Sequence, residues 1–255
     1  MNVGLCTISS KDRSVEEVIE LAGEVGYDGL EIWGQDHVGD GSVETCTHIA
    51  ETATEHGLEI ASYGSYLRCG TDEFANELEH ELAVTDRLGT ELIRVWAGRQ
   101  EYGDHDPEHW DRVVADLERL TERAAEYDVS VTVEKHANTV TNTLEGAKSL
   151  IETIDDDRCL LNYQPSFSIP ADELEREASA LTALSNQVHL QTVRECGSSQ
   201  RAPLSASFYD LEAILDPFLE NGFDGYANVE FVTDERPYRE ALEADLGTVR
   251  SAISE

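Results

Sequence analysis

The sequence is poor in basic residues. Lysine and arginine together number 18, against 53 aspartates and glutamates, and the formal net charge is −35. Proteins that bind duplex nucleic acid normally carry a basic face, so this shortage argues against a nucleic-acid partner. Molar salt shortens the Debye length to about 3 Å and so relieves the repulsion within such a chain. The composition therefore indicates a halophilic, haloarchaeal-type cytoplasm.

Paired cysteines and long apolar runs are also missing. The five cysteines are odd in number and scattered, and they form no CxxC pair, which argues against a disulfide framework and a structural zinc site. No apolar run approaches the roughly 20 residues that span a bilayer, and residues 1–5 lack the basic start of a secretory signal. We therefore expect a cytoplasmic protein with no membrane partner.

The alternation of apolar segments predicts one fold. A chain of 255 residues without a Pro/Gly/Ser-rich linker matches a single (β/α)8 TIM barrel over residues 1–255, since such barrels usually have about 250 residues. Amphipathic helical stretches alternate with strand-like segments. A doubly wound open sheet is the alternative, but no GxGxxG turn follows the first strand. The strand-like segments are residues 3–7, 29–33, 58–63, 91–96, 129–134, 159–163, 187–191 and 226–231.

Four late strands end in polar pairs with a spacing of two. Side chains alternate across a strand, so both members of each pair lie on one face. Active sites of (β/α)8 barrels lie at the carboxyl ends of the strands. Two carboxylates, an imidazole and an amide oxygen suit Mn²⁺ or Mg²⁺, with Co²⁺ or Zn²⁺ as alternatives. Each residue alone could be structural, as a core histidine or a strand-end ion pair. The pairs are Glu134 and His136, Asn162 and Gln164, His189 and Gln191, and Asn228 and Glu230.

The same segments resemble the xylose isomerase-like barrels, specifically the sugar phosphate isomerase/epimerase group. The resemblance rests on residues 4–7 (GLCT), 26–32 (GYDGLEI), 133–136 (VEKH), 188–190 (VHL) and 222–230, and covers nearly the whole chain. It implies that Glu134, His189 and Glu230 are metal ligands. Aligning on Pro165 and Ser166 puts Gln164 where the family has an aspartate ligand. Phe167 then stands where the family has a substrate-facing histidine, and Gln191 and Thr192 where it has lysine and aspartate.

By this resemblance the protein would be a metal-dependent isomerase or epimerase. Its substrate would be a small sugar, sugar phosphate or hydroxy-keto acid, and the reaction would pass through an enediolate. Glu134 and Glu230 would act as base and acid. The expected substrate contacts are His136, Asn162 and Arg194, with an aromatic wall of Trp33, Tyr66 and Trp96. A phosphate or carboxylate of the substrate would be met by Arg194 or Arg201.

Two alternative functions have to be compared with this one. Gln164 and Phe167 also fit a barrel that has lost catalysis and binds a ligand or a partner. The apurinic endonuclease branch of the same superfamily is disfavoured, because it needs more histidine and acidic ligands and a basic face. The sequence leaves the oligomeric state open, including a homo-oligomer.

Overall fold

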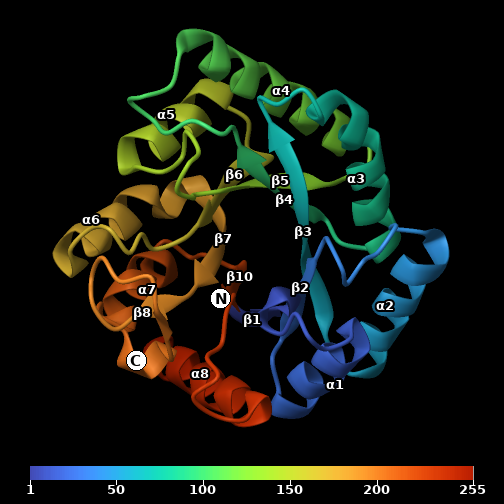
Figure 1. Cartoon of the computed structure of the whole chain (residues 1–255), viewed down its shortest axis with the longest axis vertical. Coiled ribbons are helices and arrows are strands. Elements are labelled where there is room, and N and C mark those ends of the chain that lie inside the picture. The colour runs from blue at the N-terminus through green and yellow to red at the C-terminus, as the bar shows by residue number, and fades with distance from the viewer. Residues whose placement is uncertain (255) are drawn as a thin grey trace.

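Eight parallel strands close into a barrel, as Figure 1 shows in a view along the barrel. The computed structural model describes residues 1–254. The strands neighbour one another in the order β1-β10-β7-β6-β5-β4-β3-β2, and every neighbouring pair is parallel. The predicted barrel is therefore confirmed. Its strands are β1 (Asn2–Cys6), β2 (Gly29–Trp33), β3 (Glu59–Cys69), β4 (Leu92–Ala97), β5 (Ser130–Glu134), β6 (Cys159–Tyr163), β7 (Ser185–Leu190) and β10 (Tyr226–Val229).

Helices surround the barrel as an outer ring (Figure 1). Each follows a strand in the chain, so the strands run parallel and the helices cover their outer faces. Within residues 1–254, no helix combines the length and the apolar character that crossing a membrane requires. The α-helices are α1 (Val15–Val25), α2 (Val43–Glu55), α3 (Phe74–Leu88), α4 (Pro107–Ala125), α5 (Leu144–Ile154), α6 (Ala171–Leu181), α7 (Leu211–Glu220) and α8 (Tyr238–Ala252).

Local sequence signals fix several helix ends. Ser14 and Glu17 form a capping box at the start of α1, in which each side chain accepts a hydrogen bond from the other's backbone N–H. Gly26 ends α1 in the left-handed conformation, at φ 98°. Pro107 is the first residue of α4. Pro170 is the residue before α6 rather than inside its first turn.

Strand alternation separates an apolar layer from a polar barrel interior. On β5, Val131 and Val133 belong to the apolar core shared with the helices, whereas Thr132 and Glu134 alternate with them and face the barrel axis. The interior residues are almost fully buried although they are polar. This interior sets the chemistry of the barrel, and it includes Ser62, Thr132, Asn162, Gln187, His189 and Asn228.

The structure differs from the sequence prediction mainly in two places. Strand β3 continues to Cys69, six residues past the predicted end, because its pairing with β4 resumes at Arg68 after a register shift that follows Gly64. A two-stranded antiparallel sheet, β8 (Thr192–Val193) and β9 (Arg201–Ala202), lies in the loop after β7. The remaining strand ends differ from prediction by at most two residues.

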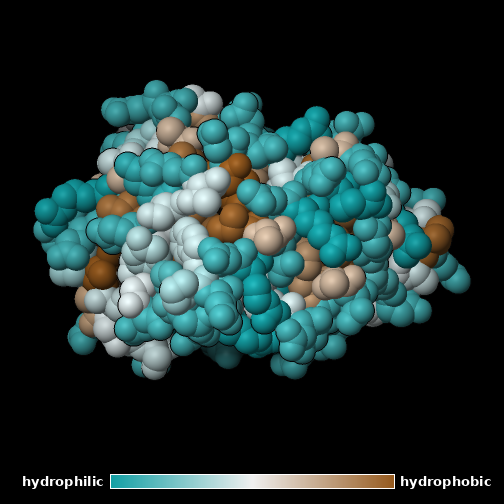
Figure 2. Space-filling model, turned by 90° about the horizontal axis from the view of Figure 1, so that it is seen from above, coloured by the Kyte–Doolittle hydropathy of each residue, from teal (hydrophilic) through white to brown (hydrophobic). Residues whose placement is uncertain are grey.

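The outer surface is mainly hydrophilic. In Figure 2 most of the visible face is teal, with small brown patches between polar side chains. Among residues 1–254, Val43 is the large apolar side chain that stands out into solvent, at 61% exposed. The acidic excess of the sequence is therefore carried on the outside of the barrel and its helices.

Candidate active site

Three side chains that could hold a metal ion converge at the carboxyl end of the barrel. Glu134 closes β5, Glu230 directly follows β10, and His189 lies next to the last residue of β7. Each offers one ligand atom, and these atoms lie within 4.8 Å of one another. All three side chains are buried. The strand-end pattern had predicted this convergence.

Gln164 lies beside this cluster. It follows β6 immediately after Tyr163, and Tyr163 pairs with Val188, the neighbour of His189. Gln164 is 7% exposed, and its Oε1 has no hydrogen-bond partner among residues 1–254. We call Glu134, Gln164, His189 and Glu230 the mouth group.

A hydrogen-bond relay holds Glu230 in place. Gln191 Nε2 donates to Glu230 Oε2 at 2.6 Å, and Arg201 Nε donates to Gln191 Oε1 at 2.9 Å. The guanidinium of Arg201 lies over the ring of Phe231, 3.5 Å from its centroid. Gln191 therefore fixes the orientation of the Glu230 carboxylate.

A second polar group lies deeper in the barrel, and the sequence reading missed its role. Glu31 on β2 accepts hydrogen bonds from Ser62 Oγ (3.1 Å), Gln187 Nε2 (2.5 Å) and His189 Nε2 (2.8 Å). Arg94 on β4 lies 3.5 Å from Glu31 Oε1 and 3.1 Å from Glu134 Oε2. We call Glu31, Ser62, Arg94 and Gln187 the inner group. Its signal in the sequence was a single charge inside each of two apolar strands, which is costly to bury without a partner.

Two glycines make room for these interior side chains. A Cβ at Gly64 on β3 would lie 2.6 Å from Glu31 Oε1 and 2.9 Å from Arg94 Nη2. Gly64 therefore lets Glu31 and Arg94 meet across the strand that separates β2 from β4. A Cβ at Gly4 would lie 1.9 Å from Asn228 Oδ1. Any larger residue at these two positions would displace a buried polar group.

The electrostatics of the two groups are opposed. Burial would raise the pKa of Glu31, but His189 and then Arg94 outweigh it and hold that pKa at about 2. Burial would lower the pKa of His189, but Glu31 raises it to about 9. Burial raises the pKa of Glu230 to about 7, with His189 opposing and Glu134 adding to the shift. Glu31 is thus held as a carboxylate, whereas Glu230 can change its proton near neutral pH.

The residues of the predicted aromatic wall form a continuous cluster. Trp33 Nε1 donates to the Tyr66 hydroxyl at 2.9 Å, and Tyr66 stacks on Trp96 with 6.3 Å between ring centroids. The ring of His136 lies 4.5 Å from that of Trp96. His136 lies beyond the end of β5, and its Nδ1 is bonded to Ala137 O at 2.7 Å. It therefore joins the wall and not the mouth group.

The other two predicted substrate contacts, Asn162 and Arg194, lie in different surroundings. A cavity of about 510 Å³ is lined by His136, Gln164, Phe167, Gln191 and Arg201, among others. Asn162 is fully buried, and neither polar atom of its side chain has a partner within residues 1–254. Arg194 lies exposed on the surface, where its Nη2 is 2.5 Å from Glu235. Arg201, not Arg194, is thus the arginine of this cavity.

The mouth group has the donor set of a divalent-cation site. His189 Nε2 is bonded to Glu31, which leaves Nδ1 directed to the Glu230 side, and Nδ1 has no hydrogen-bond partner among the described residues. Two carboxylates, this ring nitrogen and the unpartnered Gln164 Oε1 are atoms of the kinds that can hold Mn²⁺, Mg²⁺ or Zn²⁺. The amide would supply an oxygen without charge, so binding would rest mainly on the other three.

The chain resembles known proteins in sequence and in fold. A 3-dehydroshikimate dehydratase of Bacillus anthracis is 26% identical over 170 residues, which is 64% of this chain and 61% of that protein. The structure of a probable 3-DHS dehydratase, AsbF of Bacillus anthracis, superposes with a TM-score of 0.83 at 20% identity, covering 98% of this chain and 99% of that one. The structure of an IOLI protein with a zinc atom bound superposes with a TM-score of 0.80 at 20% identity, covering 100% of this chain and 98% of that one. The structure of an L-ribulose 3-epimerase superposes with a TM-score of 0.76 at 18% identity, covering 98% of this chain and 95% of that one.

The family assignment rests on a longer match. Residues 19–249 match the family model described as the xylose isomerase-like TIM barrel, which is nearly the whole barrel from α1 into α8. The expectation drawn from the sequence segments agrees with this match. The chain belongs to the xylose isomerase-like TIM barrel family.

Proposed function

We propose that the protein is a divalent-metal-dependent isomerase or epimerase. It would remove a proton next to the carbonyl of a small sugar, sugar phosphate or hydroxy-keto acid and return it at a neighbouring carbon or on the other face. Mn²⁺ or Mg²⁺ is the expected ion, with Co²⁺ and Zn²⁺ as alternatives. We further propose that the protein acts in the cytoplasm. We also propose a small-molecule substrate, because a net charge of −35 disfavours nucleic acid.

One observation carries this proposal. Glu134, His189 and Glu230 come from three different strands, yet their ligand atoms lie within 4.8 Å of one another at the end of the barrel where active sites form. Two ligand atoms of the mouth group, His189 Nδ1 and Gln164 Oε1, have no hydrogen-bond partner among residues 1–254. Buried polar atoms are normally partnered, so these two favour a ligand at this site.

Each residue of the mouth group has a distinct task. A bound divalent cation would supply positive charge to the carbonyl oxygen of the substrate. Glu230 would take a proton from carbon and return one. Glu134 lies 3.1 Å from Arg94 and would serve as the second acid/base group on the opposite face. His189 is oriented by its bond to Glu31.

The surroundings suit a polyhydroxylated substrate. Trp33, Tyr66 and Trp96 offer an aromatic face to a sugar ring, and His136 extends it. The cavity of about 510 Å³ is large enough for a small sugar or keto acid. Arg201 at its edge can meet a carboxylate or a phosphate. The shape of this cavity, rather than the mouth group, would set the choice of substrate.

Dehydration of a hydroxy-keto acid is the second candidate. It is favoured by the similarity to the 3-dehydroshikimate dehydratase of Bacillus anthracis. Loss of water begins with removal of a proton beside a carbonyl, as epimerisation does, so the same base would serve both reactions. The two differ in the next step, because dehydration also needs an acid that protonates the departing hydroxyl.

Deuterium exchange tests the shared first step. Protein purified in molar KCl is incubated in deuterated water with Mn²⁺ and a panel of ketoses, ketose phosphates and hydroxy-keto acids, including 3-dehydroshikimate. We expect one substrate class to gain deuterium at carbon, with exchange lost when the metal is chelated. Isomer formation then identifies an isomerase, and an increase in ultraviolet absorbance identifies loss of water to a more conjugated product.

The competing hypothesis is a barrel without catalysis, suggested by Gln164 and Phe167 in place of aspartate and histidine. It predicts no exchange with any compound of the panel, with or without metal. Exchange that persists after chelation would also contradict a metal-dependent mechanism.

A further inference from the structure

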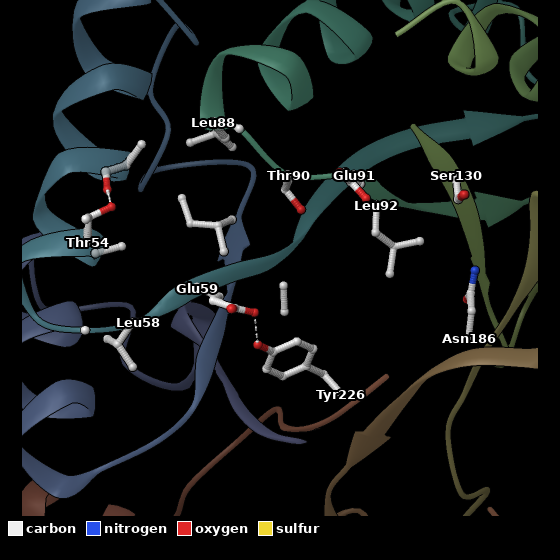
Figure 3. Close-up of a pocket in the computed structure, with 16 residues that line it drawn as sticks. Thr54, Leu58, Glu59, Leu88, Thr90, Glu91, Leu92, Ser130, Asn186 and Tyr226 are labelled. Atoms are coloured by element: carbon white, nitrogen blue, oxygen red, sulfur yellow. Dashed lines mark hydrogen bonds between the residues drawn. The ribbon is translucent and has the colours of Figure 1, made fainter. Parts of the chain in front are cut away.

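A second cavity, of about 920 Å³, lies at the opposite end of the barrel from the mouth group (Figure 3). Glu59, Leu92, Ser130 and Tyr226 line it, and each is the first residue of its strand. Ser130 and Glu134 are the two ends of β5, so the two sites are about 13 Å apart along that strand, at about 3.3 Å per residue. The cavity is therefore separate from the candidate active site.

Two glutamates line this basal cavity and no basic residue does. Glu59 and Glu91 are among the lining residues, and no lysine, arginine or histidine is. The last turn of α2 and the end of α3 at Leu88 and Gly89 also line it. The carboxyl end of a helix carries a partial negative charge that favours cations. Two carboxylates and two helix ends thus act in the same direction.

A buried hydroxyl without a partner points into this space. Thr90 is 5% exposed, and its Oγ1 has no hydrogen-bond partner among residues 1–254. Figure 3 shows this oxygen directed toward the space bounded by Leu92, Glu59 and Tyr226. Because buried polar atoms are normally partnered, an unpartnered hydroxyl at a cavity wall favours a ligand there.

Two further side chains are held in fixed positions around the same space. Asn186 Nδ2 donates to Val131 O at 3.2 Å, which leaves its Oδ1 without a partner within the described chain. The Tyr226 hydroxyl donates to Glu59 Oε2 at 2.7 Å, so the carboxylate is fixed beside the tyrosine ring (Figure 3). Leu58, Leu88 and Leu92 add an apolar surface. The cavity therefore offers acceptors at its edges and hydrocarbon between them.

We propose that this cavity binds an aliphatic amine with two or more ammonium groups. Ammonium groups are donors only, which matches a lining rich in acceptors and lacking cationic side chains. One ammonium group meets Glu59 and another meets Glu91, while the methylene chain between them covers the leucines. A phosphate or a carboxylate would meet only like charge here, and a metal ion alone would leave the apolar surface uncovered.

Calorimetric titration with spermidine tests the proposal. The titration is done in 2 M KCl, because a chain of net charge −35 attracts any polycation through its diffuse charge at low salt. We expect saturable binding of one spermidine per chain. Thr90→Val keeps the shape of the side chain and removes its hydroxyl, and it should weaken binding about tenfold. Glu59→Gln should weaken binding by a similar factor.

The controls separate a built site from general attraction. Glu51→Gln lies on α2 outside the cavity and removes the same charge as Glu59→Gln, so it should leave the affinity unchanged. A neutral diol of similar length should not bind. The proposal is overturned if the wild-type protein shows no saturable binding in 2 M KCl, or if Glu51→Gln and Glu59→Gln weaken binding equally. If Thr90→Val does not fold, the pair of glutamate variants decides the outcome.

Discussion

Glu31 of the inner group and two ligand atoms of the mouth group are neighbours in one barrel, yet they differ in hydrogen bonding. Glu31 in the inner group has four partners, namely Ser62, Arg94, Gln187 and His189. In the mouth group, Gln164 Oε1 and His189 Nδ1 have none among residues 1–254. Saturated buried charges hold a structure together, whereas unsaturated ones are set for a ligand. His189 of the mouth group is bonded to Glu31 through Nε2 and faces Glu230 with Nδ1, so it connects the two groups.

The largest effect is expected on catalysis from Glu230→Gln. The amide oxygen still accepts the hydrogen bond from Gln191, so the fold should hold. It cannot take a proton from carbon, and solvent deuterium exchange should fall about 10²–10⁴-fold. Mass spectrometry of the substrate measures the exchange, and thermal unfolding serves as the control. Exchange at the wild-type rate would remove Glu230 as the acid/base group.

The inner group should respond in the opposite way, through stability. Arg94→Met removes the guanidinium beside Glu134 and leaves Glu31 with His189 as its basic partner, which should lower the free energy of unfolding by about 3–5 kcal/mol. Arg99→Met, on the exposed loop after the same strand, is the matched control and should cost little. Denaturant unfolding in molar KCl measures both. A loss below about 1 kcal/mol for Arg94→Met would show that the inner group is not the structural layer.

The sequence predicts the residues of the mouth group better than those of the inner group. Strand ends and period-two spacing predicted Glu134, His189 and Glu230, because parallel strands bring their carboxyl ends to one edge. Arg94 and Glu31 could not be paired in this way. They lie on β4 and β2, with β3 between them, and they meet only because Gly64 has no side chain. Such a contact depends on how the strands are arranged in the barrel, so no regular residue spacing in the sequence predicts it.

The positions of residues in loops are the hardest to predict from the sequence. His136 has the parity of Glu134, but β5 ends at Glu134 and the chain then turns, so the ring of His136 lies against Trp96. Arg194 and Arg201 both follow β7 in sequence, and of the two only Arg201 lines the cavity of about 510 Å³ that contains Gln164. The short β8–β9 sheet pairs Val193 with Arg201 and turns the chain between them. Periodicity holds within a strand and is lost where the strand ends.

The metal affinity of the mouth group should increase on restoring charge. Gln164→Asp replaces an uncharged oxygen ligand by a carboxylate, and we expect Mn²⁺ to bind about tenfold more tightly. Asn142→Asp, which lines the same cavity away from the ligand atoms, controls for added charge alone. Titration of chelator-treated protein with Mn²⁺ gives both affinities. Equal gains in the two variants would contradict a ligand role for residue 164.

The smallest effect tests a single bond of the inner group. Ser62→Ala removes one donor to Glu31, which keeps three others, so unfolding should become easier by about 1–2 kcal/mol. Ser179→Ala, at an exposed position on α6, should stay within about 0.5 kcal/mol of the wild-type protein. Parallel denaturant curves of the two variants give the comparison. No difference between them would mean that the inner hydrogen bonds add little to stability.

Thermal unfolding with and without Mn²⁺ tests the central claim most directly, since it asks whether the mouth group binds a metal. Chelator-treated protein in molar KCl is heated alone, with Mn²⁺, and as the Glu230→Gln variant with Mn²⁺. A ligand that binds only the folded state raises the midpoint of unfolding. We predict a clear rise with Mn²⁺ in the wild-type protein and a much smaller one in Glu230→Gln. No shift in the wild-type protein, or equal shifts in both, would contradict a metal site formed by Glu134, His189 and Glu230.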